Sequence, residues 1–297
     1  MEYICFDIGG TETKFAVINE KYQIHYKSSF PTQINKGSNL FLQRIIQEIN
    51  KAKEKYLING VGISSPGIIN TETGEVIFAN ERGKFFQGIN YYSIISKETH
   101  LFCQAENDAN CFAIAETLNH KEDFLMLTIG TGIGGAIIMD NKVYRGINLS
   151  AGAFGQIRLT NNAKFEELSS VNTLICKGKQ YYPDIKNGED LFAFYDKGSP
   201  HAITIINEFY HFLSLGIINL AYIFSPPKII IGGGITNRKS FGNELLDAIN
   251  KNKDSAYFGQ TKVLISEYKN DGGFIGALVN LLNKNKNNSC FLKTSKL

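Results

Sequence analysis

One short stretch of the chain combines two acids and an amide: Glu106-Asn107-Asp108. The apolar run 101–105 before it is typical of a strand, and residues 109–118 after it are rich in helix formers. Asn107 or Asp108 is therefore expected to cap the helix, with its side-chain oxygen accepting from a free backbone N–H. The alternative is chemical. A carboxylate between a strand end and a helix start is held ionised by the helix dipole and can take a proton from a hydroxyl group.

A first glycine turn lies near the N-terminus and has the sequence Asp7-Ile-Gly9-Gly10-Thr11-Glu-Thr-Lys14. The residues on either side predict a β-hairpin, and its glycines let backbone N–H groups approach an anion closely. Asp7 could hold Mg²⁺, directly or through water, because hard cations prefer carboxylate and phosphate oxygens. A plain hairpin turn is the alternative. The spacing matches neither G-x-x-x-x-G-K-[ST] nor the strand-to-helix G-x-G-x-x-G.

Two further glycine turns follow apolar strands. Residues 127–135 contain four glycines in six positions, which packing alone hardly explains because each glycine weakens a strand. A tight turn with bulges is the alternative reading of that stretch. Gly232-Gly233-Gly234 follows a run of three isoleucines and suits a nucleotide seat, since glycine allows close approach, but alone it is a weak signal.

The order of the predicted elements indicates two α/β lobes of similar design, because strands followed by helices occur twice. No linker rich in Pro, Gly and Ser separates them, so we expect neighbouring lobes with a cleft between them. The expected domains are 1–107 plus about 272–297, and 108–271. The expected strands are 3–8, 14–18, 22–30, 58–64, 101–105, 124–129, 134–139, 228–231 and 262–266, with a hairpin over 68–78, and the expected helices are 40–52, 91–99, 109–118, 165–177, 189–195, 202–224, 240–251 and 274–282.

Composition limits the class of protein. The 297 residues are 43% hydrophobic and 20% charged, as in a soluble globular protein. A net charge of +3 is too small to argue for nucleic acid as a partner. The N-terminus has no signal-peptide pattern, and no uninterrupted run approaches the roughly 18 apolar residues of a membrane span. A cytoplasmic protein without a membrane partner is expected.

The cysteines and histidines do not have the spacing of metal ligands. The chain has five of each, and the cysteines form no C-x-x-C pair. Reduced thiols and no zinc site are therefore expected.

Four motifs, in their order along the chain, resemble those of the ROK (repressor, open reading frame, kinase) family of sugar kinases in the hexokinase–actin–Hsp70 superfamily. The resemblance runs from about residue 3 to about residue 283 and is nearest to bacterial β-glucoside kinases, with N-acetylmannosamine kinases next. It implies two ribonuclease-H-like lobes of the actin/hexokinase ATPase type that close over ATP, Mg²⁺ and a sugar, and it implies a homodimer. The motifs are Asp7-x-Gly-Gly-Thr-x-x-Lys14, Glu106-Asn-Asp-Ala-Asn110, Thr128-x-Gly-Thr-Gly-x-Gly-Gly135 and Ile231-Gly-Gly-Gly-Ile235.

The resemblance also implies roles for individual residues. Asp108 corresponds to the base that takes the proton of the sugar 6-hydroxyl, and Asp7 to the magnesium-binding carboxylate. Asn80 and Asn107 correspond to sugar-binding asparagines, and Ser65-Pro66-Gly67 to the loop beneath the sugar. The residues implied at the phosphates are Asp7, Gly9, Gly10, Thr11, Lys14, Thr131, Gly132 and Gly134, and those implied at the adenosine are Gly233 and Gly234.

The chain departs from the family pattern after the second glycine turn. Most members have Glu-x-Gly-His there, with both side chains on the sugar, whereas this chain has Ala153-Phe-Gly-Gln156. Gln156 can still donate and accept hydrogen bonds, but Ala153 cannot. A hydrogen bond to a charged group contributes about 1.5–3 kcal/mol, so the loss weakens the sugar site unless a nearby group such as Glu166 or Glu167 replaces it. The cysteines of the family's zinc motif are also missing, as in its zinc-less branch.

The expected activity is ATP-dependent phosphorylation of the 6-hydroxyl of a hexose or β-glucoside, with cellobiose or another β-glucoside favoured. N-Acetylmannosamine kinase and glucokinase are the alternative enzymes. A sugar-binding protein of weakened activity is a further alternative, because of Ala153. A sugar-sensing repressor would need a helix-turn-helix pattern, which this sequence does not show.

Overall fold

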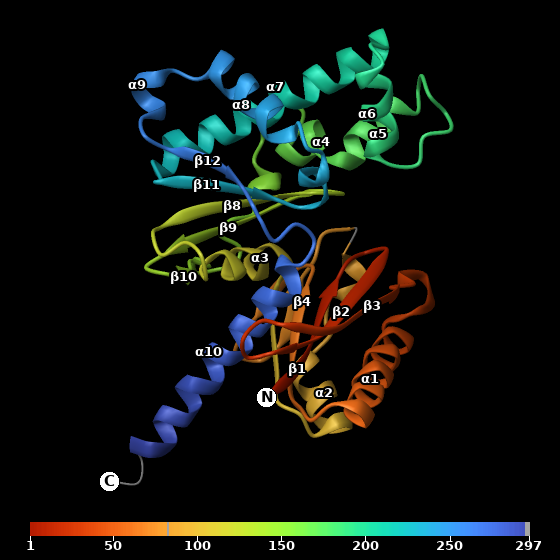
Figure 1. Cartoon of the computed structure of the whole chain (residues 1–297), viewed down its shortest axis with the longest axis vertical. Helices are drawn as coiled ribbons and strands as arrows, with labels where there is room; N and C mark the ends of the chain where they lie inside the picture. The colour runs from red at the N-terminus through yellow and green to blue at the C-terminus, as the bar shows by residue number, and fades with distance from the viewer. Residues whose placement is uncertain (82, 295–297) are drawn as a thin grey trace. The chain divides into compact units, whose positions relative to one another are not determined.

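The computed structural model describes residues 1–81 and 83–294 and divides the chain into two compact units (Figure 1). The N-terminal unit contains Met1–Leu118, Gly146–Ser150 and the chain from Asp271 onward. The C-terminal unit contains Asn119–Arg145 and Ala151–Asn270. Each unit is an α/β structure built on its own five-stranded sheet, as expected for this fold class.

The sheet of the N-terminal unit has the order β3-β2-β1-β4-β7. Strands β1, β2 and β3 form an antiparallel meander, while β4 and β7 run parallel to β1. Parallel strands end at the same edge of a sheet, so the residues at the ends of β1, β4 and β7 lie together. The strands are β1 (Glu2–Ile8), β2 (Glu12–Asn19), β3 (Ile24–Pro31), β4 (Ile58–Ser65) and β7 (Cys103–Asn107), with a separate hairpin of β5 (Ile68–Asn70) and β6 (Glu75–Phe78).

Side chains alternate between the two faces of this sheet. Ile4, Phe6 and Ile8 pack with residues of α1 (Ser38–Lys55) and α2 (Tyr91–Thr99) in one buried core. The opposite face is covered by α10 (Gly272–Thr294), on the other side of the sheet in Figure 1. Asp7, one residue along from Phe6, therefore faces α10.

Helix α3 (Asp108–Glu116) packs closely against α10. A Cβ at Gly276 of α10 would lie 1.6 Å from the backbone oxygen of Cys111, so only glycine allows this approach. Helix α3 belongs to the N-terminal unit, which contains Met1–Leu118, whereas the sequence pattern placed 108–271 in the C-terminal lobe.

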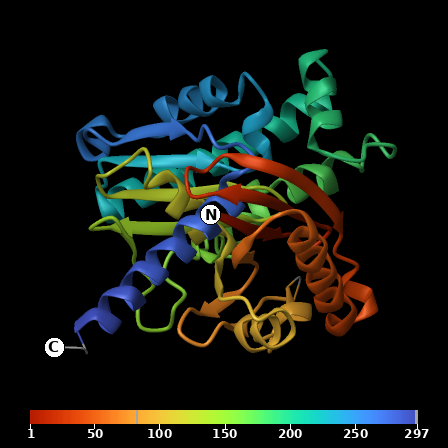
Figure 2. The same ribbon diagram turned by 60° about the horizontal axis from the view of Figure 1, so that its bottom comes forward.

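The sheet of the C-terminal unit has the order β10-β9-β8-β11-β12, the same pattern as the first sheet. Its strands run side by side in Figure 2. Strands β8, β9 and β10 are antiparallel, and β11 and β12 are parallel to β8. The strands are β8 (Phe124–Ile129), β9 (Ile133–Met139), β10 (Lys142–Val143), β11 (Lys228–Gly232) and β12 (Lys262–Ile265).

The helices of this unit follow the expected order with one correction. The single helix predicted over 165–177 is wrong: α4 ends at Ser169 and a new helix begins after Ser170, whose hydroxyl accepts from the backbone N–H of Thr173 at 3.3 Å. The helices are α4 (Phe165–Ser169), α5 (Val171–Gly178), α6 (Gly188–Asp196), α7 (Pro200–Phe224), α8 (Phe241–Asn252) and α9 (Ser255–Phe258), and the chain also has 3₁₀ turns at Ile34–Lys36, Lys84–Phe86, Phe154–Gln156 and Gly234–Asn237.

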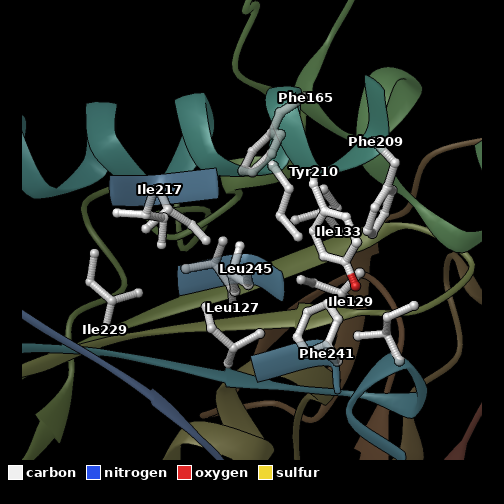
Figure 3. Close-up of a cluster of buried hydrophobic side chains, with 14 of the residues drawn as sticks. Leu127, Ile129, Ile133, Phe165, Phe209, Tyr210, Ile217, Ile229, Phe241 and Leu245 are labelled. Atoms are coloured by element: carbon white, nitrogen blue, oxygen red, sulfur yellow. The ribbon is translucent and has the colours of Figure 1, made fainter. Parts of the chain in front are cut away.

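Helix α7 is the central helix of the C-terminal core. Figure 3 shows its Phe209 and Ile217 with Leu127 of β8 and Leu245 of α8 in one apolar cluster. In the described part of the chain it is the one helix long and apolar enough to cross a membrane, and 56% of its most apolar window is buried. A core helix passes the same test, so α7 is weak evidence for a membrane span.

Candidate active site

The first glycine turn joins β1 to β2 and is fixed by Thr32. The backbone N–H of Gly9 donates to Glu12 O at 3.0 Å. The hydroxyl of Thr32 donates to Gly9 O at 2.7 Å, and its backbone N–H donates to Thr11 O at 2.9 Å. A Cβ at Gly10 would meet nothing within 4 Å, so the turn leaves open space above its backbone. An ordered and open glycine turn of this kind can receive an anion.

Asp7 is the next-to-last residue of β1, just before this turn. Its Oδ1 accepts from the hydroxyl of Ser64, which is paired with it on β4, at 2.7 Å. Burial raises the pKa of Asp7 above its usual value, and the Ser64 hydrogen bond and the charge of Lys14 act against that rise. Lys14 is the cross-strand partner of Asp7 on β2. The first glycine turn thus lies close after Asp7 in the chain, with Lys14 opposite Asp7 on β2.

Asn107 and Asp108 lie at the same edge of the sheet, at the junction of β7 and α3. Asn107 is the N-cap of α3, and its Oδ1 accepts from Asn110 N at 3.1 Å. Its Nδ2 donates to Asp108 Oδ1 at 2.9 Å and to Gly67 O at 3.0 Å. The capping role left open between the two residues therefore belongs to Asn107. The carboxylate of Asp108 is therefore not the N-cap of α3.

Asp108 has a raised pKa of about 6, with burial of the carboxyl group as its main cause. The backbone N–H of Ala109 donates to Oδ1 at 2.8 Å and lowers the pKa, whereas the charge of Asp7 raises it. Asp108 as a whole residue is exposed, so solvent reaches it even though the surrounding protein atoms desolvate its carboxyl group. A carboxylate with a pKa near 6 is ionised at neutral pH and is a better proton acceptor than an ordinary aspartate.

The loop Ser65-Pro66-Gly67 is held from both ends. The buried Ser65 hydroxyl shares a 2.8 Å hydrogen bond with Tyr91 OH, so this side chain supports the loop from inside the core. Gly67 has φ +101°, and a Cβ there would lie 2.8 Å from Phe78 O. Through the bond from Asn107 to Gly67 O the loop is connected to the α3 cap. Asn80 lies beyond β6 and is exposed, with its Oδ1 accepting from Gly83 N at 3.1 Å.

In the C-terminal unit the second and third glycine turns lie side by side. Thr128 of β8 pairs with Gly232 of β11. A Cβ at Gly233, where φ is +91°, would lie 2.5 Å from Ile129 O, so the approach of the two turns requires glycine. A Cβ at Gly234 would meet nothing within 4 Å. The expected residues Thr131 and Gly132 lie on the second turn between β8 and β9, where Thr131 is exposed, and Gly134 lies at the start of β9, paired with Thr128.

Gln156 lies in a short hydrogen-bonded chain of side chains. Its Oε1 accepts from Lys164 Nζ at 2.8 Å, and its Nε2 donates to Glu166 Oε1 at 2.9 Å. The other oxygen of Glu166 lies 2.7 Å from the place of a Cβ on Gly132. Ala153 has no carboxylate, but the carboxylate of Glu166 accepts a hydrogen bond from Gln156 in the same loop region. The contact between Glu166 and Gln156 is not visible in the sequence, because the nine residues between them fold back only through the 3₁₀ turn and α4.

Metal ions in proteins are held by groups of His, Cys, Asp and Glu side chains. Among the residues whose side chains are described (1–81 and 83–285) there is no group of three or more His, Cys, Asp or Glu that could hold a metal ion. Cys5, Cys103, Cys111 and Cys176 are free thiols, and the side chain of Cys290 lies outside the described part. Asp7 fits a hard cation, because Ser64 occupies one of its oxygens and its charge is not balanced by an ion pair within hydrogen-bonding distance among the described residues.

Two α/β units with the same strand order and glycine turns at the strand ends define a class of protein: the kinases of the actin/hexokinase ATPase fold. The chain belongs to the ROK family, whose profile matches residues 3–284. The family and the fold class inferred from the four motifs are therefore confirmed.

The relatives are similar over nearly the whole chain. Beta-glucoside kinase from Listeria innocua serovar 6a is 33% identical over 298 residues, covering 95% of this chain and 98% of its own. A ROK family protein from Streptococcus pneumoniae, solved in complex with sucrose, has 26% identity and a TM-score of 0.85 and covers 97% of this chain and 100% of its own. A ROK family glucokinase from Streptomyces griseus, solved with glucose and AMPPNP, shares the fold at 24% identity, TM-score 0.81 and coverage of 93% and 98%. The chain is a carbohydrate kinase.

Proposed function

We propose that this enzyme transfers the γ-phosphoryl group of ATP to the 6-hydroxyl of a hexose or β-glucoside, with β-glucosides favoured. The observation that carries the proposal is the edge of the N-terminal sheet. The parallel strands β1, β4 and β7 place Asp7, Ser64 and Glu106 in register. The glycine turn follows β1, and Asn107 and Asp108 lie at the junction of β7 and α3. Phosphoryl transfer to a hydroxyl needs a site that binds the phosphates and a carboxylate that can accept the proton of the hydroxyl, and this edge offers residues for both.

Asp108 is the proposed base. Phosphoryl transfer depends on positioning and charge stabilisation, and the base orients the acceptor hydroxyl and removes its proton as the new bond forms. Asn107 Nδ2 and Ala109 N both donate to Oδ1 of Asp108 and fix the carboxylate plane. The other oxygen, Oδ2, is then the proton acceptor for the sugar hydroxyl.

Asp7 is the proposed ligand of Mg²⁺, directly or through water. Bound magnesium would supply positive charge that neutralises the phosphate oxygens. Lys14 and the backbone N–H groups of Gly9, Gly10 and Thr11 are the chain's own contribution to the same task. Asp7 is half-buried and its pKa is raised by desolvation, so a nearby cation would stabilise its ionised form.

The proposed sugar-binding residues are Asn80, Asn107, the loop Ser65-Pro66-Gly67 and Gln156. Glu166 is added to this set, since its bond to Gln156 supplies the carboxylate that Ala153 lacks. The preference for β-glucosides rests on the Listeria innocua relative, a β-glucoside kinase. N-Acetylmannosamine and glucose are the competing acceptors.

The nucleotide is proposed to lie on the second and third glycine turns. Thr131, Gly132 and Gly134 would face its phosphates, and Gly233 and Gly234 its adenosine. The open space around Gly234 supports this placement, as does AMPPNP in the Streptomyces griseus structure. A homodimer, expected from the family resemblance, completes the proposal, together with a cytoplasmic location and no membrane or nucleic-acid partner, which are expected from the composition and charge of the sequence.

A coupled ADP-release assay tests the activity with cellobiose, aryl β-glucosides, glucose and N-acetylmannosamine as acceptors. Sugar-dependent ADP release, fastest with a β-glucoside, is the expected result. Release that is fastest with glucose or N-acetylmannosamine would replace the acceptor and keep the reaction. Absence of release with all four, together with calorimetric binding of a sugar, would show a sugar-binding protein of lost activity.

A further inference from the structure

Two residues outside the recognised motifs touch the Asp7 carboxyl group. Ser64 lies beside it on β4 and is fully buried, with its hydroxyl donating to Oδ1 at 2.7 Å. Gly273 lies in the first turn of α10, more than 260 residues away in sequence, and a Cβ there would be 2.2 Å from Oδ1 and 2.3 Å from Cγ. Both contacts arise because alternation turns Asp7 toward α10.

The Ser64 contact selects one oxygen of the carboxylate. A buried hydroxyl needs a partner, and here the partner is Oδ1. Within the described residues, Oδ2 of Asp7 takes part in no hydrogen bond or ion pair of its own. The hydrogen bond therefore fixes the rotation of the carboxylate and leaves Oδ2 for a cation or for a water molecule bound to that cation.

The Gly273 contact sets the position of the whole carboxyl group. The backbone of Gly273 does not have positive φ, so any residue could adopt it, and glycine costs about 1 kcal/mol relative to alanine within a helix. The reason for glycine is therefore space. An added methyl group would overlap Oδ1, Cγ and Oδ2, all within 2.7 Å, and would push the carboxyl group away from its place.

The start of α10 is itself fixed in place. Asp271 forms an ion pair with Lys27 of β3, and Lys27 Nζ lies 5.2 Å from the centre of the Phe274 ring. The backbone N–H of Ile275 donates to Asp271 O at 3.1 Å. These contacts therefore hold in place the first turn of α10, which packs against Asp7.

We infer that Ser64 and Gly273 are positioning residues that hold the Asp7 carboxylate in the orientation required by the magnesium–nucleotide complex. The inference rests on the proposed function. It extends the phosphate site from its glycine turn to β4 and to the start of α10, which no motif connects.

The test measures binding of Mg²⁺ with a non-hydrolysable ATP analogue by calorimetry, without sugar or turnover. Ser64→Ala and the nearly isosteric Ser64→Cys are each expected to weaken binding roughly tenfold or more, because a hydrogen bond to a charged group is lost. Gly273→Ala is expected to weaken it at least as much. Manganese in place of magnesium gives an EPR signal that reports the ion site directly, and the variants should release Mn²⁺ at lower competitor concentration.

Two control variants separate positioning from general damage. Gly272→Ala disturbs the same helix turn but meets the Phe112 ring at 2.7 Å and not Asp7. Ser214→Ala removes a fully buried hydroxyl of the C-terminal unit that donates to His211 O. Both should bind Mg²⁺ and nucleotide within about twofold of the wild type, even where thermal stability falls.

Three outcomes decide the matter. Wild-type binding of Mg²⁺ and nucleotide by Ser64→Cys and Gly273→Ala would overturn the inference and leave the proposed function intact. Equal losses in Gly272→Ala and Gly273→Ala would also overturn it, because the effect would then be damage to α10. Failure of the wild-type protein to bind the magnesium–nucleotide complex would overturn the proposed function together with the inference.

Discussion

Replacing Asp108 by asparagine removes the proposed base with little change in shape. Its Oδ1 accepts from Asn107 Nδ2 at 2.9 Å and from Ala109 N at 2.8 Å, and an asparagine oxygen can accept both bonds. The helix cap is a property of Asn107 and remains, because its Oδ1 accepts from Asn110 N. Asp108→Asn should therefore fold normally and still bind sugar.

The expected loss of rate follows from the state of the carboxylate. With a pKa of about 6, Asp108 is more than about 90% ionised at pH 7.5, so nearly all wild-type molecules carry the base. General base catalysis contributes about 100- to 10,000-fold. At tenfold per 1.36 kcal/mol this corresponds to about 3–5 kcal/mol of activation free energy. The asparagine amide cannot take a proton, so we expect kcat to fall by that factor or more.

The assay is coupled ADP release with the best acceptor, together with calorimetric titration of the same sugar. Asp247→Asn, at an exposed position of α8, is the matched control and should retain wild-type rates. The predicted pattern is a loss of kcat in Asp108→Asn with a sugar affinity within a few-fold of wild type. Turnover of Asp108→Asn within tenfold of wild type would refute the role of Asp108 as base.

Three further predictions concern pH, the sugar site and stability. Because the pKa of Asp108 is raised to about 6, kcat/KM should fall about tenfold per pH unit below pH 6 and be level above pH 7, and a profile level to pH 5 would contradict this. Glu166→Ala should raise the KM for sugar about tenfold with a smaller change in kcat, since the carboxylate bonded to Gln156 is lost, and an unchanged KM would exclude Glu166 from the sugar site. Arg238→Ala should lower the free energy of unfolding by about 2 kcal/mol, because Glu244 and Asp196 each lose a bidentate pair of hydrogen bonds to the guanidinium group. Urea denaturation measures this change, and an unchanged midpoint would count against it.

Sequence reasoning placed the helices and strands of the candidate site that depend on short-range patterns in the chain. Helix α2 begins and ends where its apolar spacing predicted, at Tyr91 and Thr99. The strands flanking the first two glycine turns were placed within one or two residues, since each of these turns and its strands form one short hairpin. The family resemblance, which rests on motifs at such hairpins and strand ends, is confirmed by the ROK family profile over residues 3–284.

The parts that depend on long-range packing were not predictable from one sequence. Nothing near Gly273 indicates that it contacts Asp7, because the contact requires the register of β1 and the placement of α10. Helix propensity did not show the break at Ser170, where a side-chain cap competes with continuation of the helix. Placement of α3 with the N-terminal unit likewise depends on the close approach at Gly276, which is invisible in local periodicity.

The central claim is that this chain phosphorylates a sugar hydroxyl with ATP, and identification of the product tests it most directly. The wild-type protein is incubated with ATP, Mg²⁺ and phenyl β-glucoside, which offers a single 6-hydroxyl, and the product is analysed by phosphorus and proton NMR. We predict a phosphomonoester on C6, formed in equal amount to ADP and absent without magnesium. A phosphate on another carbon, or no phosphorylated product with phenyl β-glucoside, cellobiose, glucose or N-acetylmannosamine, would contradict the account.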